Sequence, residues 1–455
     1  MTKRAWPAWA DPKDILDLLR LSLPIAVSRA SFMLMMLTDT IVLGRNRPEE
    51  LPYVLNSHLP VGVLLGLSLG ILLGVSVMTA EFSGKGEAHK TGRIFRRGVV
   101  SALLLGVVGV VPMFFGAHWL YSSLGFEGAV LEGTTTVTRI LAFAMLAQIF
   151  NTTMTYYLEA LRKPLLVSVA MYIGVVVNLM LDLAFVSGSW GFPELGATGV
   201  AFATTGTNWC LMLVLLGFVA WKTPAFKSSG EKQDGEAKRQ ISVGMGMAVS
   251  NVAEFGSFNF THIIATWIGI AAASVYGMMF QTIGFVFMAF LGIGTATSVR
   301  VAERVGRGEF GAVKNASRLG LLVCVLVGAA AALLMSSAND GLASVFVQRD
   351  ALVANVQLHP ELSAMILFAA GIVIFDGLQN VAAMASRAQG LVWQPAIAHL
   401  ASYMVIMVPL AWYLGLVEGR GVQGMAEAVL VASVFAAITQ LVILEVLPRR
   451  ALKKG

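Results

Sequence analysis

The chain has 455 residues, of which 57% are hydrophobic and only 13% are charged, and its formal net charge is +6. Soluble globular proteins contain about 25% Asp, Glu, Lys and Arg, so this composition excludes a soluble enzyme, a disordered chain and a coiled coil. A polytopic helical membrane protein is the class that remains.

Apolar stretches separated by short polar or glycine-containing segments follow one another along the whole chain. A membrane-spanning helix needs about 20 apolar residues, which predicts an all-α protein with twelve transmembrane helices. The first stretch is longer than the core of a signal peptide, so we interpret it as a span rather than a cleaved leader. The predicted spans are 16–43, 52–80, 94–121, 135–160, 165–187, 197–221, 241–268, 273–302, 315–338, 361–388, 395–416 and 423–446.

The positive charges support this alternation of spans and loops. Nearly all of the 32 Lys and Arg residues, Arg387 among them, fall on segments that lie on one side of the membrane, whereas the opposite side receives Arg45, Arg47, Arg349 and Arg420. Cytoplasmic loops are enriched in Lys and Arg, so both termini are predicted to be cytoplasmic. The basic net charge therefore reports topology and does not indicate nucleic-acid binding.

Two motifs occur twice at nearly the same offset. AEFSGKGE (80–87) and AERVGRGE (302–309) share Ala, Glu, two glycines and the final Glu at matching positions. GATGVAFA (196–203) and GVQGMAEA (421–428) share two glycines and two alanines. Such matches indicate an internal duplication of the chain.

The duplication predicts two pseudo-symmetric lobes of six helices each. The N-lobe comprises residues 1–221, the C-lobe comprises 241–455, and the polar segment 222–240 is a cytoplasmic linker between them. An even number of spans per repeat places the symmetry axis along the membrane normal, with a cavity between the halves. This arrangement is typical of secondary transporters.

Four acidic residues lie inside the predicted spans, away from their ends, where charge is costly and usually functional. Asp182 follows Asn178 by one helical turn, so both lie on one face. Glu254 and Asp376 also have polar neighbours at helical spacing, and such carboxylates offer oxygen ligands to a hard cation such as sodium. With Asp39 and Asp182 in the first half, each half has an acidic site.

Asp39 differs from the other three because its neighbours on the same helix face, including Met35 and Met36, are apolar or thioether side chains. A carboxyl in such surroundings favours its neutral form, which suits a group that loads and unloads a proton. The structural alternative is that the four acids pair with Arg29 or Arg139, the basic residues within spans. Arg29 lies about 15 Å from Asp39 along the helix, too far for direct pairing.

The sequence contains no metalloprotease, P-loop or nucleophile-elbow motif. An enzyme and transport driven by ATP on this chain are therefore not expected, and an ion gradient remains as the driving force. Flexible methionines and aromatic faces suit a cavity for varied organic cations. We predict that this cavity is lined by Met35, Met36, Asn251, Ser257, Phe258, Gln281, Gln379 and Asn380.

Taken together, these features resemble the multidrug and toxic compound extrusion (MATE) family over the whole chain. The segments that carry the resemblance are LPIAVS and TDTIVLG within 23–44, AEFSGKGE (80–87), YLEALRKP (157–164), NLMLD (178–182), GATGVAFAT (196–204), AERVGRGE (302–309) and FDGLQNVAAMASRAQG (375–390).

The resemblance implies two lobes around a cleft and export of cationic, often aromatic compounds against inward flow of sodium or protons. It assigns ion or proton coupling to Asp39, Asn178, Asp182, Thr204, Glu254 and Asp376. The last two match the C-lobe acids of the NorM-type branch and are the candidate sodium ligands. Two departures from the family pattern are Arg29, where an uncharged polar residue is expected, and the connector 45–55.

We further predict a monomer in the bacterial cytoplasmic membrane that needs no cofactor and meets small organic cations and lipid, not nucleic acid. The alternative within the same superfamily is a flippase for lipid-linked precursors. Such a protein favours a basic cavity for pyrophosphate, whereas the acids within these spans outnumber Arg29 and Arg139. A receptor or membrane enzyme is a third class, disfavoured by the duplication and by the lack of catalytic motifs.

Overall fold

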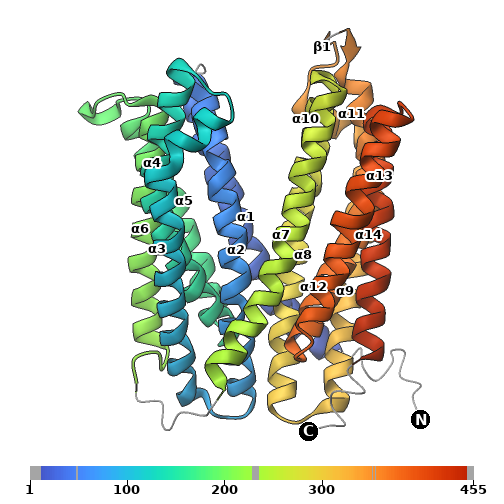
Figure 1. Ribbon diagram of the computed structural model, residues 1–455. Coiled ribbons are helices and arrows are strands. Elements are labelled where there is room, and N and C mark those ends of the chain that lie inside the picture. The colour runs from blue at the N-terminus through green and yellow to red at the C-terminus, as the bar shows by residue number, and fades with distance from the viewer. Residues whose placement is uncertain (1–11, 48–49, 228–234, 351, 354, 448–455) are drawn as a thin grey trace. The chain divides into compact units, whose positions relative to one another are not determined.

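In the computed structural model the chain is almost entirely helical (Figure 1). The structure describes residues 12–47, 50–227, 235–350, 352–353 and 355–447. The long helices are α1 (Pro12–Asn46), α2 (Leu51–Gly84), α3 (Thr91–Ser123), α4 (Gly128–Ala160), α5 (Pro164–Phe185), α6 (Gly196–Lys222), α7 (Glu236–Ile268), α8 (Ile270–Gly306), α9 (Phe310–Ser337), α11 (Leu358–Ala388) and α14 (Gly421–Val446).

Eleven helical segments of the described chain are long and apolar enough to cross a membrane, judged by length and composition. This confirms a polytopic, nearly all-helical membrane protein. The remaining predicted span, 241–268, is helical within α7, but its Ser, Asn, Thr and Glu side chains lower its mean hydropathy. The total of twelve spans therefore stays a prediction.

Several short elements were not predicted from the sequence. The connection between α9 and α11 contains a short helix, α10 (Asn339–Phe346), and an antiparallel pair of strands, β1 (Leu352–Val353) and β2 (Val356–Gln357). Single 3₁₀ turns occupy Ala88–Lys90 and Ser189–Gly191. These elements are too short for a hydrophobic period to reveal them.

The eleventh predicted span, 395–416, is one continuous helical segment with wide turns. It starts as α12 (Trp393–His399), continues through π-helical turns over Leu400–Met407, returns to α-helix in α13 (Val408–Trp412) and ends in a second π-helical stretch, Tyr413–Val417. Pro409, at the start of α13, has no N–H for a regular helical bond. π-helical turns are rare and are often found at functional sites.

Packing divides the chain into two compact units. The N-terminal unit is Val27–Ala248, and the C-terminal unit is Met1–Ala26 together with Val249–Gly455. The boundaries fall inside α1 and α7, so the first part of each helix belongs to a different unit from its remainder. The predicted lobes instead changed at the linker 222–240, of which residues 228–234 lie outside the described chain. Hydropathy marks a helix but does not specify which neighbours it packs against.

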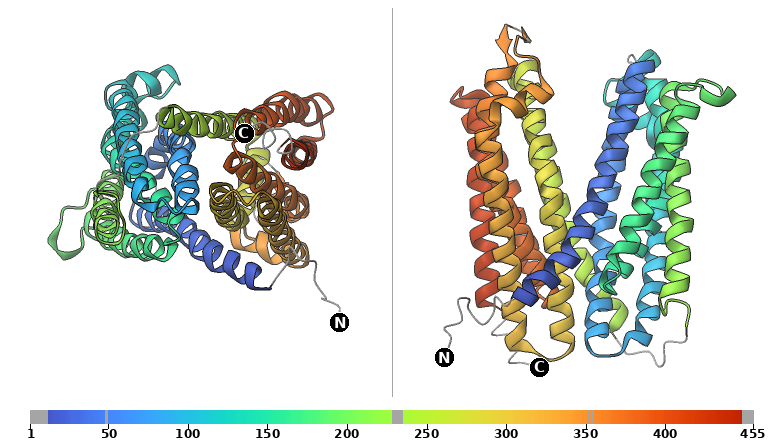
Figure 2. Two further views of the ribbon diagram at one scale, coloured as in Figure 1. Left: turned by 90° about the horizontal axis from the view of Figure 1, so that it is seen from below. Right: turned by 180° about the vertical axis from the view of Figure 1, so that it is seen from behind.

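Each unit is a bundle of long helices (Figure 2), and in each unit one helix packs against three others. In the N-terminal unit α4 packs against α2, α3 and α6, and in the C-terminal unit α11 packs against α8, α9 and α14. These two helices are the fourth predicted span of each repeat. This equivalence is consistent with the duplication inferred from the sequence.

The repeated motifs fold into the same turns. Gly86 and Gly308 both have a left-handed backbone, with φ of +77° and +72°. In both turns the residue after this glycine donates its N–H to a carbonyl five residues earlier, over 3.0 Å. Gly196 and Gly421, which begin α6 and α14, have φ of +56° and +57°. Glycine is needed here because other residues rarely adopt this conformation.

Glycines allow α2 and α7 to approach closely within the N-terminal unit. A Cβ atom added to Gly70 would lie 2.3 Å from Cα of Ala248, and one added to Gly244 would lie 1.9 Å from the carbonyl oxygen of Ile71. Both obstacles are backbone atoms, which cannot rotate away. Small residues are used in this way where membrane helices pack backbone to backbone.

We expect Gly70→Ala to destabilise the protein by about 1–3 kcal/mol, the usual penalty for overpacking. The free energy of unfolding in detergent, from denaturant titration, is the measurement. Gly62→Ala on the same helix is the matched control, because a Cβ atom there meets nothing within 4 Å. Equal stabilities of the two variants would contradict the close packing of α2 and α7.

Candidate functional site

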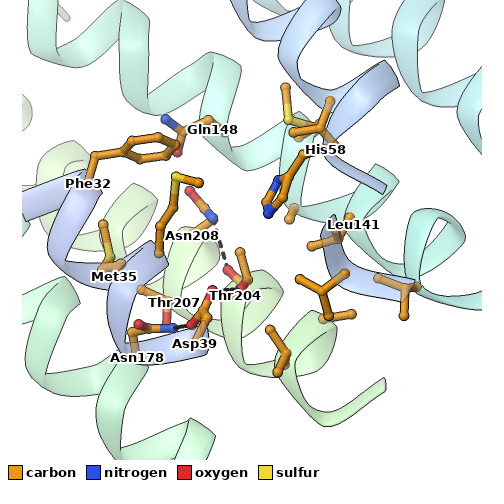
Figure 3. A pocket seen from close by; sticks show the side chains of 18 of the residues that line it. Phe32, Met35, Asp39, His58, Leu141, Gln148, Asn178, Thr204, Thr207 and Asn208 are labelled. Carbon is orange, nitrogen blue, oxygen red and sulfur yellow. Dashed lines mark hydrogen bonds between the residues drawn. The ribbon is translucent and has the colours of Figure 1, made fainter. Parts of the chain in front are cut away.

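A pocket of about 770 Å³, including its open mouth, lies within the N-terminal unit (Figure 3). Its walls come from α1, α2, α4, α5 and α6 and are mostly apolar. Met35 and Met36, predicted to line a substrate cavity, are both among its lining residues. Asp39 supplies a carboxyl group to the same wall of the pocket.

Polar side chains from two other helices meet the Asp39 carboxyl. Asn178 of α5 donates from Nδ2 to Asp39 Oδ1 over 3.0 Å, and Thr204 of α6 donates from Oγ1 to Oδ2 over 3.2 Å (Figure 3). Thr38 in turn donates to Asn178 Oδ1 over 3.0 Å. The apolar surroundings expected for Asp39 are therefore only half correct. The period of one helix reveals its own face but not the side chains that other helices bring to it.

Asp182 completes the acidic part of this site. It is fully buried, and its carboxyl is close enough to the Asp39 carboxyl for the two groups to interact. Neither Asp182 oxygen has a donor among the described residues. Two ionised carboxylates only accept hydrogen bonds, so a bond between Asp39 and Asp182 requires one of them to carry a proton. Two neighbouring carboxyl groups disfavour double ionisation, which suits one proton shared between them.

Packing holds Asp39 in this orientation. One turn further along α1, Val42 and Leu43 enter an apolar cluster formed with α2, α4 and α6. Leu43 has no exposed surface, so rotating α1 to turn Asp39 away would pull this side chain out of the cluster. Asn178 and Asp182 share one face of α5 through their spacing of four residues.

Four polar residues of the pocket were missed by sequence reasoning. His58 of α2, Gln148 of α4, and Thr207 and Asn208 of α6 line it together with Asp39. The Asn208 amide donates to the Thr204 carbonyl over 2.9 Å. Asn208 follows Thr204 by one turn of α6, so helical spacing could have pointed to it. His58 and Gln148 lie on other helices, and no spacing rule links residues on separate helices.

The two basic residues within predicted spans have partners other than the four acids. Arg29 forms an ion pair with Glu159 of α4 at 3.1 Å and lies 5.8 Å from the centre of the Tyr156 ring. Arg139 donates from Nε to the carbonyl oxygen of Phe114 over 3.0 Å. The alternative that these arginines neutralise the intramembrane acids is therefore not supported among the described residues.

We expect Arg29→Met to lower the free energy of unfolding by about 3 kcal/mol, because Glu159 would keep a buried charge without its partner. Denaturant titration of the purified protein in detergent measures this loss. The double variant Arg29→Met, Glu159→Gln removes both charges and should recover most of the stability. A single variant as stable as the parent would show that the pair is energetically neutral.

Charged residues near the ends of α2 and α8 also form ion pairs. Glu81 accepts from Arg239 at 2.7 Å and from Lys85 at 2.9 Å within the N-terminal unit. In the C-terminal unit Arg300 binds the Asp14 carboxylate at 2.6 Å. These ion pairs attach the first turns of α7 and α1 to the units that contain them.

The C-terminal unit contains the other two acids. Asp376 of α11 is buried and accepts from Ser433 Oγ of α14 over 2.8 Å and from the Tyr403 hydroxyl over 3.5 Å. Tyr403 lies in the π-helical turns Leu400–Met407. Glu254 of α7 is half-buried and accepts from Gln379 Nε2 over 3.3 Å. Carboxylate, hydroxyl and amide groups therefore gather where α7, α11 and α14 contribute side chains.

This donor set fits a hard monovalent cation or a proton. No group of three or more His, Cys, Asp or Glu converges within the described part of the chain. Two carboxylates supplemented by neutral oxygens from Ser433, Tyr403 and Gln379 suit sodium, which prefers oxygen ligands, rather than a transition metal.

The other predicted cavity residues lie in the C-terminal unit. Asn251, Ser257 and Asn380 are buried, and the Phe258 ring packs 4.5 Å from that of Phe280. Gln281 is exposed. Their place in a substrate cavity stays a prediction.

The sequence matches known proteins over most of its length. A family model described as MatE covers residues 24–184 and 246–413. A probable multidrug resistance protein NorM of Caulobacter vibrioides is 32% identical over 93% of this chain and 90% of its own length. A protein of the same description from Deinococcus radiodurans is 27% identical over 93% of this chain and 94% of its own.

Solved structures share the fold. The outward-facing conformation of a multidrug resistance MATE family transporter of the MOP superfamily gives a TM-score of 0.88, with 19% identity and 97% of each chain covered. A crystal structure of MATE in the bent conformation gives 0.86, with 18% identity over 98% of this chain and 97% of the other.

Proposed function

Because this chain belongs to the MATE family, we propose that it is a secondary active exporter that expels organic cations of many structures while sodium ions or protons flow inward. The family resemblance of the motifs is confirmed, and the chain is a membrane transporter rather than an enzyme. Several relatives are described as multidrug resistance proteins NorM, which supports multidrug efflux as the general activity.

The observation that carries the proposal is the pocket in which the Asp39 carboxyl meets apolar and thioether walls. Asp39 attracts a cationic group, while Phe32 and Met35 offer a flat ring and a flexible side chain to its apolar part. Such walls adapt to different molecules because few contacts are directional. The pocket therefore suits organic cations as a class better than one defined substrate.

Proton exchange in the N-terminal unit is assigned to Asp39 with Asn178, Asp182 and Thr204. When the pair Asp39 and Asp182 holds one proton, its remaining single charge attracts a cationic substrate. A second proton neutralises the pair and releases that substrate. Substrate and proton then compete for the same charge, which is the requirement for exchange in opposite directions.

Cation binding in the C-terminal unit is assigned to Glu254 and Asp376. Tyr403, Ser433 and Gln379 supply neutral polar groups to these acids. A bound cation shifts the conformational equilibrium only if its affinity differs between the two states. In the proposed cycle, loading this site favours the conformation that releases substrate outside.

The proposed setting is the bacterial cytoplasmic membrane with both termini in the cytoplasm. Support comes from the distribution of Lys and Arg over the loops and from the eleven apolar helical segments. In this orientation the turns at Gly86 and Gly308 face the cytoplasm.

Efflux of a cationic dye from proteoliposomes under separately imposed sodium and proton gradients tests this function. We expect dye movement against its gradient when at least one of the two ions flows in the opposite direction. Dye movement that depends on neither the sodium nor the proton gradient would contradict antiport. Translocation of a lipid-linked precursor without any dye transport would favour the flippase alternative.

A further inference from the structure

Arg387, at the end of α11, carries a buried positive charge in the C-terminal unit and has no role in the proposed transport cycle. The charge pattern predicts that it lies on the cytoplasmic side, and in the structure it lies in the last turn of α11 with only 1% of its surface exposed. It is among the largest fully buried side chains of the described residues. Burying a guanidinium is costly unless a partner compensates, so the surroundings of Arg387 require an explanation.

The contacts of Arg387 lead to Glu254. Its Nη2 atom donates to Ser250 Oγ over 2.6 Å, and Ser250 precedes Glu254 by one turn on the same face of α7. On α11, Gln379 lies two turns before Arg387 and donates to Glu254. The guanidinium and the Glu254 carboxylate therefore lie along the same contact between α7 and α11, where each acts electrostatically on the other.

No carboxylate within the described chain lies within 4.0 Å of Arg387 as a conventional ion pair, and its Nε atom has no acceptor there. The positive charge of Arg387 therefore acts on the acidic site through space, without a direct ion pair to a carboxylate. His399 of α12 also experiences the field of Arg387, and neither of its ring nitrogens has a partner among the described residues.

The charges of this cluster can be counted. Glu254 and Asp376 contribute two negative charges when ionised, and a guanidinium keeps its positive charge under all physiological conditions. Tyr403 is uncharged at neutral pH, and His399 adds no charge in its neutral form. The cluster therefore has a net charge of one negative unit. One monovalent cation or one proton neutralises it, whereas a divalent cation or two sodium ions would leave an excess of buried positive charge.

We propose that Arg387 is a built-in counter-ion of the Glu254–Asp376 site that restricts it to a single monovalent cation, sodium or a proton, and excludes divalent ions. The inference rests on the proposed function only in that Glu254 and Asp376 receive the coupling cation. Arg387 is a positioning and selectivity residue and not itself a cation ligand.

Calcium binding tests the charge count, because two carboxylates without a counter-ion form an oxygen site that suits a divalent cation. The full-length protein is purified in detergent, and calcium affinity is measured by isothermal titration calorimetry. We expect Arg387→Gln to bind calcium at least about tenfold more tightly than the parent, because a unit positive charge has been removed from a low-dielectric cluster. Arg387→Lys keeps the charge and should behave like the parent.

A control and a second variant make the result decisive. Arg96→Gln also removes one positive charge, but Arg96 donates to the carbonyls of Ala225 and Lys227 in the other unit, so calcium affinity should not change. If Arg387→Gln does not fold, Ser250→Asp brings the cluster to the same net charge while keeping the guanidinium. It should gain calcium affinity to a similar degree.

Unchanged calcium affinity in whichever of Arg387→Gln and Ser250→Asp folds would overturn the counter-ion proposal, as would tight calcium binding by Arg387→Lys. The parent protein is assayed for dye efflux in liposomes from the same preparation. If dye efflux is absent but the variants bind calcium as expected, the result contradicts the proposed transport function and not the role of Arg387. Normal efflux with unchanged calcium affinity would contradict the role of Arg387 alone.

Discussion

Asp376→Asn is expected to abolish ion-driven dye efflux, because the substitution removes a charge that Ser433 and Tyr403 surround with hydroxyl groups. Losing an ionic contact in a buried site costs about 1.5–3 kcal/mol, which corresponds to roughly 10- to 100-fold in cation affinity. The amide is nearly isosteric with the carboxyl and accepts the same hydroxyl hydrogen bonds through its oxygen. Dye efflux under an imposed sodium or proton gradient is the measurement.

Ser433→Ala is the matched control for this prediction. It removes the 2.8 Å hydrogen bond to Asp376 but leaves the carboxylate charge, so efflux should fall by less than in Asp376→Asn. The difference in efflux between the two variants separates the effect of the lost charge from that of the lost hydrogen bond. An Asp376→Asn protein that folds and retains full ion-driven efflux would remove this residue from the proposed coupling site.

The helices of this protein are readable from its sequence because a membrane imposes long apolar segments. The duplicated motif around Gly86 and Gly308 also indicates equivalent turns, and both glycines have a left-handed backbone conformation in the structure. The polar residues Asn178 and Asp182 were also predictable as a pair, because both lie on α5, where their spacing places them on one face.

What the sequence could not reveal depends on contacts between helices. The period of α1 shows methionines beside Asp39 but not Thr204, which arrives from α6; only the family resemblance pointed to it. Arg387 lies in the last turn of an apolar helix, and nothing local shows that Ser250 receives its guanidinium. For the same reason the unit boundaries within α1 and α7 were missed. The sequence of one helix does not show which other helices it packs against.

Asp39→Asn is expected to lower proton-driven efflux strongly while leaving the fold intact. Asn178 and Thr204 both donate to Asp39, and the asparagine oxygen can accept one of these bonds, but the amide cannot take up a proton. It also ends the sharing of a proton with Asp182. We expect proton-driven dye efflux to fall by about 10- to 100-fold, from the loss of about 1.5–3 kcal/mol of charged interaction in the pocket.

Thr38→Val provides the comparison, because it keeps the Asp39 charge and removes only the hydroxyl that donates to Asn178. Its efflux should fall by a few-fold at most, since one neutral hydrogen bond contributes about 1 kcal/mol. Efflux measured over a series of imposed pH gradients separates the two variants. The Thr38→Val protein should still respond to the gradient, whereas residual efflux by Asp39→Asn should be independent of it. If Asp39→Asn keeps its response to the pH gradient, the proton enters elsewhere, and the pair formed by Asp39 and Asp182 has a structural role.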